Sequence, residues 1–130
     1  ILKFDIEGHF LNIIGGVGQG PEEYPSGAYN MAVDAQNGVV YAFISPDILL
    51  SYSLTGEFLQ RVHVQMPEGV SGVQYPEIFQ VQNGLLYFYY MNAGAIGEKP
   101  LYWMAMNKDG TLVRCRRGQK ARTFFIREFC

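Results

Sequence analysis

Apolar and polar residues alternate along the chain in short runs, which indicates strands separated by tight turns. In residues 1–6, Leu2, Phe4 and Ile6 share one face of an extended chain, and the other face is largely polar. Residues 85–91 are apolar on both faces, as expected for an inner strand between neighbouring sheets. Helical spacing is not sustained over any 11-residue window, so no helix longer than a turn or two is expected.

Two kinds of hairpin repeat in strict alternation. Residues 1–14 are echoed 48 positions later by residues 49–62, and residues 102–113 form a third copy. Each copy has an apolar strand followed by a turn that ends in glycine, and these glycines are Gly8, Gly56 and Gly110. The second kind carries an Asn-Gly turn, at residues 37–38 and 83–84. The predicted hairpins cover residues 1–15, 28–44, 48–65, 77–91 and 101–117.

One hairpin of each kind makes a four-stranded unit of about 48 residues, a period typical of a β-propeller. We therefore predict an all-β chain of antiparallel propeller blades, organised as a single domain over residues 1–130. A β-sandwich or a lipocalin-like barrel is the alternative, but neither requires two alternating hairpin types. Fifteen glycines and a 48% hydrophobic share fit many short strands in a folded chain.

Charge and cysteines add little to this picture. The net charge is −2, but the tail, residues 118–130, continues a basic stretch. The basic side chains of that stretch are Arg114, Arg116, Arg117, Lys120, Arg122 and Arg127. They are interpreted as a solvated strand and terminus rather than a nucleic-acid site. Cys115 and Cys130 form no metal set and are interpreted as free thiols, with a disulfide as the alternative. No apolar run is long enough for a transmembrane helix, and no signal segment is seen.

The sharpest local motif is glycine-rich and covers residues 15–24. A nucleotide loop would need a following helix, whereas Pro21, Pro25 and a hairpin follow here. We therefore interpret the motif as a connector between blades, with Tyr24 packed into the cleft between them.

These residues carry a resemblance to a known family. The frame includes Phe4-Asp5, Gly8, Phe10-Leu11, Ile14-Gly15, Gly18-Gln19-Gly20-Pro21, Glu23-Tyr24, Val33-Asp34 and Val40-Tyr41. It resembles the six-bladed β-propellers of the Bacteroidetes, which are related to NHL-repeat propellers. Glu22 stands where that family usually has a further glycine. The resemblance implies an extracytoplasmic protein without catalytic residues to carry over.

The chain holds about two and a half of the six units that such a propeller needs. It also starts at Ile1 rather than Met. We expect either a piece of a longer protein or copies that associate to complete the ring. Residues 120–130 abandon the blade pattern, as the altered end of a fragment would, and a terminal swapped strand in residues 123–129 is the alternative.

Candidate chemistry is sparse, and no catalytic, cofactor-binding or metal-binding residue is predicted. His9 and His63 are interpreted as surface histidines without Cys, Asp or Glu at ligand spacing. Glu22 and Glu23 are adjacent and point in opposite directions on an extended chain. The hairpin aspartates are expected to bond their own backbone, and they are Asp5, Asp34 and Asp109.

An aromatic cluster is the remaining candidate, and it consists of Tyr87, Phe88, Tyr89, Tyr90, Tyr102 and Trp103. Packing between blades is favoured over stacking on a sugar or peptide. The function that follows is noncatalytic binding of a protein, peptide or glycan by loops on one face. A carbohydrate-active lyase or hydrolase with a site at the central channel is the alternative.

Overall fold

The computed structural model describes residues 1–28, 30–66, 76–91 and 101–118. These residues form ten strands, and no helix occurs among them. The strands are β1 (Leu2–Phe4), β2 (Phe10–Ile13), β3 (Asn30–Asp34), β4 (Val39–Ser45), β5 (Ile48–Ser53), β6 (Phe58–His63), β7 (Glu77–Gln82), β8 (Leu85–Met91), β9 (Leu101–Met106) and β10 (Leu112–Gly118). The tail beyond Gly118, with Cys130 and the stretch read as an altered end or swapped strand, lies outside the described residues.

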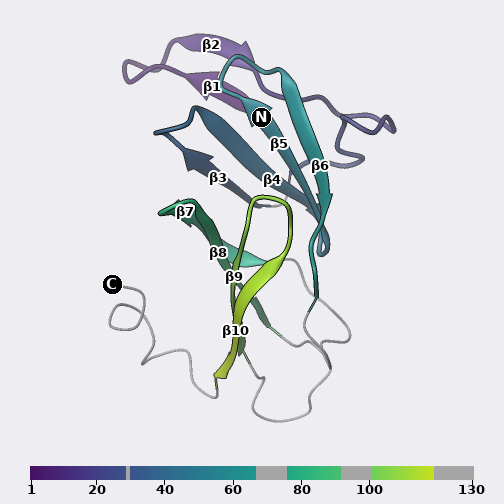
Figure 1. Ribbon diagram of the computed structural model, residues 1–130. Coiled ribbons are helices and arrows are strands. Elements are labelled where there is room, and N and C mark those ends of the chain that lie inside the picture. Colours follow the sequence, from purple (N-terminus) through teal and green to yellow (C-terminus); the bar gives the residue numbers. More distant parts are fainter. Residues whose placement is uncertain (29, 67–75, 92–100, 119–130) are drawn as a thin grey trace.

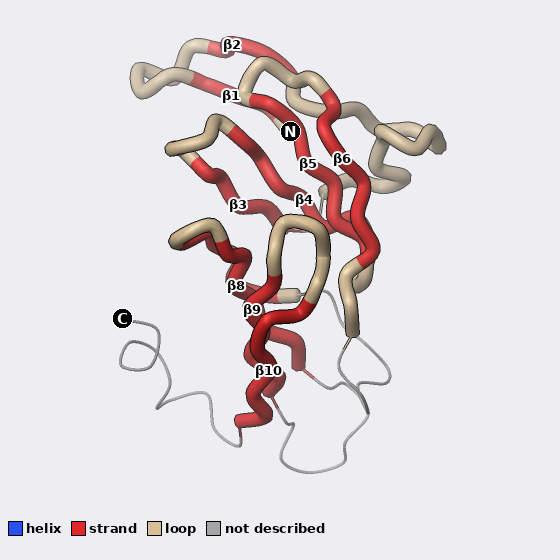
Figure 2. The backbone as a smooth tube through the Cα atoms, in the orientation of Figure 1, coloured by secondary structure: helices blue, strands red, loops and turns tan. Residues whose placement is uncertain are grey.

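The strands form three antiparallel sheets that are stacked as layers (Figure 1). We call β1–β2 the half blade, β3–β6 the first full blade and β7–β10 the second full blade. In both full blades the strands follow one another in sequence order across the sheet, as the colours of Figure 1 show, and turns and loops join them (Figure 2). The predicted fold class is therefore confirmed: the chain is all-β, its units are four-stranded and antiparallel, and the ring is incomplete.

The turn glycines explain why the outer hairpins form where they do. Gly8, Gly56 and Gly110 all have a positive φ, at 88°, 99° and 86°. In each turn the glycine N–H donates to the carbonyl three residues earlier, over 3.0 to 3.1 Å. A residue with a β-carbon disfavours this left-handed backbone, so the three turns share one local cause.

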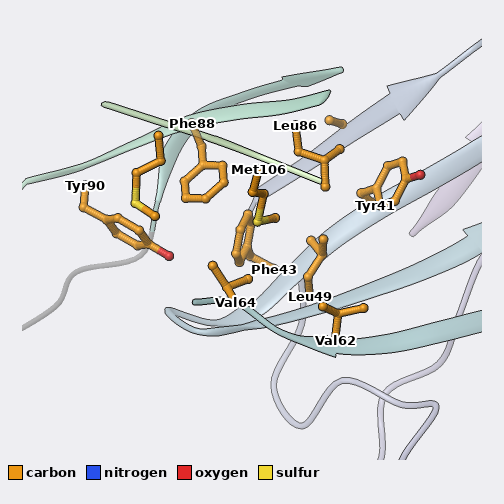
Figure 3. Close-up of a cluster of buried hydrophobic side chains, with 11 residues drawn as sticks. Tyr41, Phe43, Leu49, Val62, Val64, Leu86, Phe88, Tyr90 and Met106 are labelled. Atoms are coloured by element: carbon orange, nitrogen blue, oxygen red, sulfur yellow. The ribbon is translucent and has the colours of Figure 1, made fainter. Parts of the chain in front are cut away.

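The core divides into two clusters, one on each face of the first full blade. Along β4, Val40 and Ile44 enter the cluster shared with the half blade. Tyr41 and Phe43 point to the other face and enter the cluster shared with the second full blade. Figure 3 shows the second cluster, in which the rings of Phe43 and Phe88 meet edge to face with centroids 5.2 Å apart.

Candidate functional site

The glycine-rich motif forms a closed loop between β2 and β3. Val17 and Tyr24 form an isolated parallel bridge, and the Tyr24 N–H donates to the Gly16 carbonyl over 2.9 Å. The Gly18 N–H donates back to the Tyr24 carbonyl over 3.2 Å. The loop is therefore held by its own backbone rather than by a following helix.

The carboxylate of Glu23 fills the centre of this loop. It accepts a hydrogen bond of 2.9 Å from the Gly20 N–H. A β-carbon on Gly18 would collide with the same carboxylate, and one on Gly20 would lie 3.1 Å from it. Glycines that could cradle a phosphate here enclose an anion that the chain itself supplies, which agrees with the connector interpretation.

Tyr24 and Tyr52 fix the connector to the blades. Tyr24 is buried, and its hydroxyl donates to the Ile14 carbonyl over 3.1 Å. The Tyr52 hydroxyl donates to the Glu22 carbonyl over 2.8 Å. Burial, with smaller contributions from neighbouring groups that include Tyr24, raises the pKa of Tyr52 to about 12. Both rings lie within 3 Å of where a β-carbon of Gly15 would stand, so the close approach of the loop requires glycine there.

The hairpin aspartates bond their own backbone, as the sequence predicted. Asp5 accepts from the His9 N–H over 2.8 Å, and Asp109 accepts from the Thr111 N–H over 2.9 Å. These backbone hydrogen bonds are the main cause that lowers the pKa of each carboxyl. The side-chain amide of Asn37 is the main cause that lowers the pKa of Asp34, which also accepts from the Asn37 N–H.

The expectation that His9 has no Asp or Glu at ligand spacing was wrong. The structure brings Asp5, Glu7 and His9 together, with ligand atoms within 4.8 Å of one another, and His9 Nδ1 lies 3.0 Å from Asp5 Oδ2. The hairpin turn folds residues four apart onto one side, a proximity that spacing in an extended strand does not give. The group is exposed on the surface. His63 lies on β6 with its side chain largely exposed, as expected, but its Nδ1 also lies 3.9 Å from Asp47 Oδ2.

The aromatic cluster splits between the two faces of the second full blade. Phe88 and Tyr90 are buried in the core between the full blades. Tyr89 and Trp103 form a cross-strand pair on the other face, with ring centroids 5.0 Å apart, and Tyr87 shares that face. Packing between blades is therefore confirmed for Phe88 and Tyr90. The side chain of Tyr102 lies outside the described residues.

The hairpin turns meet at one end of the stacked sheets, which we call the turn end: residues 5–9, 34–38, 53–57 and 107–111. Within the first full blade, the Leu54 N–H donates to the Gly38 carbonyl over 3.1 Å. Between the full blades, Lys108 Nζ lies 3.3 Å from Asp34 Oδ2. The turn end carries five carboxylates and one lysine: Asp5, Glu7, Asp34, Glu57, Asp109 and Lys108. Asp34 is buried beside Lys108, and the Lys3 ammonium donates to the Leu54 carbonyl at this end, so the four remaining carboxylates leave the turn end with a net negative charge.

The half blade exposes an apolar face. Leu2 pairs with Ile13 and Phe4 pairs with Phe10, so the four side chains lie on the same face of the two-stranded sheet. They are between 51% and 59% exposed, whereas the opposite face, with Lys3, contacts the first full blade through the Leu54 carbonyl. Exposed apolar faces of this kind mark interaction surfaces.

Sequence reasoning missed the contacts between blades. Lys108 and Asp34 are 74 residues apart, and the Leu112 N–H donates to Gln65 Oε1 over 3.1 Å across 47 residues. The repeat could have predicted such contacts, because equivalent turns lie at equivalent places in neighbouring blades. The part of Glu23 in closing the loop was not predicted either.

Comparison with known proteins agrees with this architecture. A family model described as a 6-bladed beta-propeller matches residues 1–116. No curated protein and no solved structure gives a significant match. In the described part of the chain, no helix is long and apolar enough to cross a membrane.

Proposed function

Because this chain belongs to the family of 6-bladed beta-propellers, we propose that it is a noncatalytic binding module whose ligand is a polypeptide with basic side chains. The observation that carries this proposal is the turn end, where turns from successive sheets come together and, besides the buried Asp34–Lys108 pair, carry four carboxylates near the single ammonium group of Lys3. Loops held by a rigid scaffold are the usual place for binding residues. Charge complementarity favours cationic partners and disfavours the phosphate backbone of nucleic acids.

The state of the turn carboxylates supports a noncatalytic role. Asp5, Asp34 and Asp109 are used as acceptors for backbone N–H groups of their own turns. Their pKa values are lowered, so they stay ionised around neutral pH. A general acid needs the opposite shift, toward the working pH. These groups therefore shape the loops and supply negative charge.

The proposals about relatives, source organism and cellular location rest on the sequence frame from Phe4 to Tyr41. On that resemblance we propose that the chain is related to NHL-repeat propellers, comes from the Bacteroidetes and works outside the cytoplasm. Fractionation of cells that express the protein from its own gene tests the location. Recovery in the cytoplasmic fraction would contradict it.

The binding proposal is tested by titrating the ¹⁵N-labelled chain with three probes: a short Lys-Gly peptide, a Glu-Gly peptide of equal length and chitohexaose. The Lys-Gly peptide is expected to shift amide resonances of residues 5–9, 34–38, 53–57 and 107–111. Because the attraction is between exposed charges, the shifts should weaken as salt is added.

Two exposed carboxylates supply variants that keep the turns intact. Replacing Glu7 and Glu57 together by glutamine should weaken binding of the Lys-Gly peptide several-fold. Glu22→Gln removes an equally exposed charge from the connector and serves as the matched control. Shifts caused by chitohexaose alone would indicate a glycan ligand instead, and turn resonances that respond to none of the probes would refute the proposal.

A further inference from the structure

The hairpin turn between β1 and β2 brings together three side chains that can bind a metal ion. Asp5, Glu7 and His9 each offer one ligand atom, and these atoms all lie within 4.8 Å of one another. Among the residues that the structure describes, they form the one group of this kind. An imidazole with two carboxylates suits divalent transition metals such as Zn²⁺, whereas Mg²⁺ and Ca²⁺ prefer oxygen ligands alone.

Two of the ligand atoms already lie at a distance that one ion can bridge. His9 Nδ1 is 3.0 Å from Asp5 Oδ2. Two ligands of a tetrahedral zinc ion, each about 2.0–2.1 Å from the metal, lie roughly 3.3 Å apart. The other oxygen of the same carboxylate, Asp5 Oδ1, accepts the His9 N–H over 2.8 Å, which fixes the direction of Oδ2. Small movements of the two side chains are therefore enough to admit an ion between them.

The turn itself does not require this set of side chains. In the equivalent turn of the first full blade, the three positions hold Ser53, Thr55 and Glu57. There the Ser53 hydroxyl accepts the Glu57 N–H over 3.1 Å, so a hydroxyl is sufficient as the acceptor that closes the turn. The second carboxylate and the imidazole of the turn at residues 5–9 therefore exceed what the backbone needs.

Exposure of these three positions is a property of the turn. The turn at residues 107–111 closely contacts the preceding sheet through Gly110. Its side chains at the same three positions nevertheless remain exposed, and they are Asn107, Asp109 and Thr111. Packing of the turn against a preceding sheet therefore leaves side chains at these positions accessible to an ion in the solvent.

We propose that Asp5, Glu7 and His9 bind one divalent transition-metal ion of the Zn²⁺ class. The three side chains supply two carboxylate oxygens and one imidazole nitrogen, and water completes the coordination. The ion joins the first and last residues of the turn, and its charge balances those of the two carboxylates. This site goes beyond the binding of a basic polypeptide proposed above and does not depend on it.

The experiment is a titration of the untagged, ¹⁵N-labelled chain with ZnCl₂. Both cysteines are replaced by serine (Cys115→Ser and Cys130→Ser), because thiolates are strong zinc ligands themselves. Zn²⁺ should shift the amide resonances of residues 5–9 and the imidazole nitrogens of His9. Isothermal titration calorimetry should show saturable binding of one ion per chain, and CaCl₂ should bind at least tenfold more weakly.

Substitutions at the exposed positions test the ligands one at a time. Glu7→Gln and His9→Gln each remove a ligand and should weaken Zn²⁺ binding by at least about tenfold. His63→Gln is the matched control, because the side chains of His9 and His63 are equally exposed, at 77%, and each lies beside one aspartate. It should change the affinity by less than about twofold. The amide spectra report whether each variant keeps the fold.

Three results would overturn the proposal: no saturable binding of Zn²⁺, equal affinity of His9→Gln and His63→Gln, or binding of Ca²⁺ as tight as that of Zn²⁺. The metal site and the proposed function fail separately, because the ZnCl₂ titration contains no peptide. Zinc binding that is lost in His9→Gln would support the site even if the Lys-Gly peptide leaves the turn resonances unchanged.

Discussion

The α-carbon of Gly110 faces the carbonyl oxygen of His63 so closely that a β-carbon on residue 110 would overlap that oxygen. Gly56 stands in the same relation to the half blade, where a β-carbon would lie 2.6 Å from the Ile13 carbonyl oxygen. The turns that contain Gly56 and Gly110 thus closely contact the outer strand of the preceding sheet. Around Gly8, the third member of the set, a β-carbon would meet no atom within 4 Å.

Gly110→Ala is therefore expected to destabilise the chain by roughly 3 kcal/mol, since left-handed strain adds to overpacking against a backbone atom. Gly8→Ala should lower the free energy of unfolding by only about 1 kcal/mol, because Gly8 has nearly the same φ as Gly110 but a β-carbon there would meet no neighbouring atom. Urea unfolding of both variants measures the difference. Equal losses would mean that the blade contact at Gly110 contributes nothing beyond the local turn.

The connector gives a second comparison. Gly18→Ala displaces the Glu23 carboxylate from the loop and should destabilise the chain by about 1–2 kcal/mol, the typical cost of a lost charged hydrogen bond. In Gly16→Ala the new methyl group would lie 3.9 Å from Glu23, so little change is expected. Thermal unfolding monitored by near-UV circular dichroism checks both. If Gly18→Ala is as stable as Gly16→Ala, the carboxylate does not hold the loop.

The Lys108–Asp34 contact predicts how stability depends on pH. Asn37 first, and Lys108 to a smaller extent, lower the pKa of folded Asp34 below its ordinary value of 3.8. The contribution of this carboxylate is thus fully present above pH 3.8 and is lost as pH falls through the lowered pKa. Lys108→Met should be less stable than the unmodified chain at pH 7.

The difference between Lys108→Met and the unmodified chain should shrink as the pH falls through the lowered pKa of Asp34, because the carboxyl then becomes protonated. It should also shrink at high salt, because Lys108 is partly exposed. Urea unfolding across this pH range provides the measurement. A difference in stability that does not change between neutral and acid pH would show that Lys108 acts through packing rather than through its charge.

Tyr52 should ionise only in strong alkali. Its pKa is raised from 10.0 to about 12, mainly by burial, so its stabilising effect is complete below pH 10 and is lost as pH rises through 12. A difference absorbance titration at 295 nm between the unmodified chain and Tyr52→Phe should show one phenol that titrates near pH 12. Tyr52→Phe should also cost about 1 kcal/mol at pH 7, since the hydrogen bond to the Glu22 carbonyl is lost. If the phenol that Tyr52→Phe lacks titrates near pH 10 in the unmodified chain, the buried environment of Tyr52 would be contradicted.

The positions of the hairpin turns were predicted well from the sequence, because they depend on local backbone requirements. Gly8, Gly56 and Gly110 identified their turns because a positive φ is a property of one residue and its immediate neighbours. The contacts of Gly110 with His63 and of Lys108 with Asp34 were not predicted, since they depend on how twisted sheets stack. The proximity of His9 to Asp5 was not predicted either, since it depends on how the hairpin turn folds the two residues onto one side.

Strand β4 contributes side chains to both core clusters, with Val40 and Ile44 on one face and Tyr41 and Phe43 on the other. Disturbing either cluster changes the surface on which the other one packs, so this strand is where folding cooperativity passes from sheet to sheet. Its amides should exchange with solvent only when the whole chain opens, whereas those of β1 should exchange through local opening. The hydrogen-exchange profile would then rank the strands by the number of sheets that cover them, with β4 and β5 the slowest, because both contribute to the two core clusters.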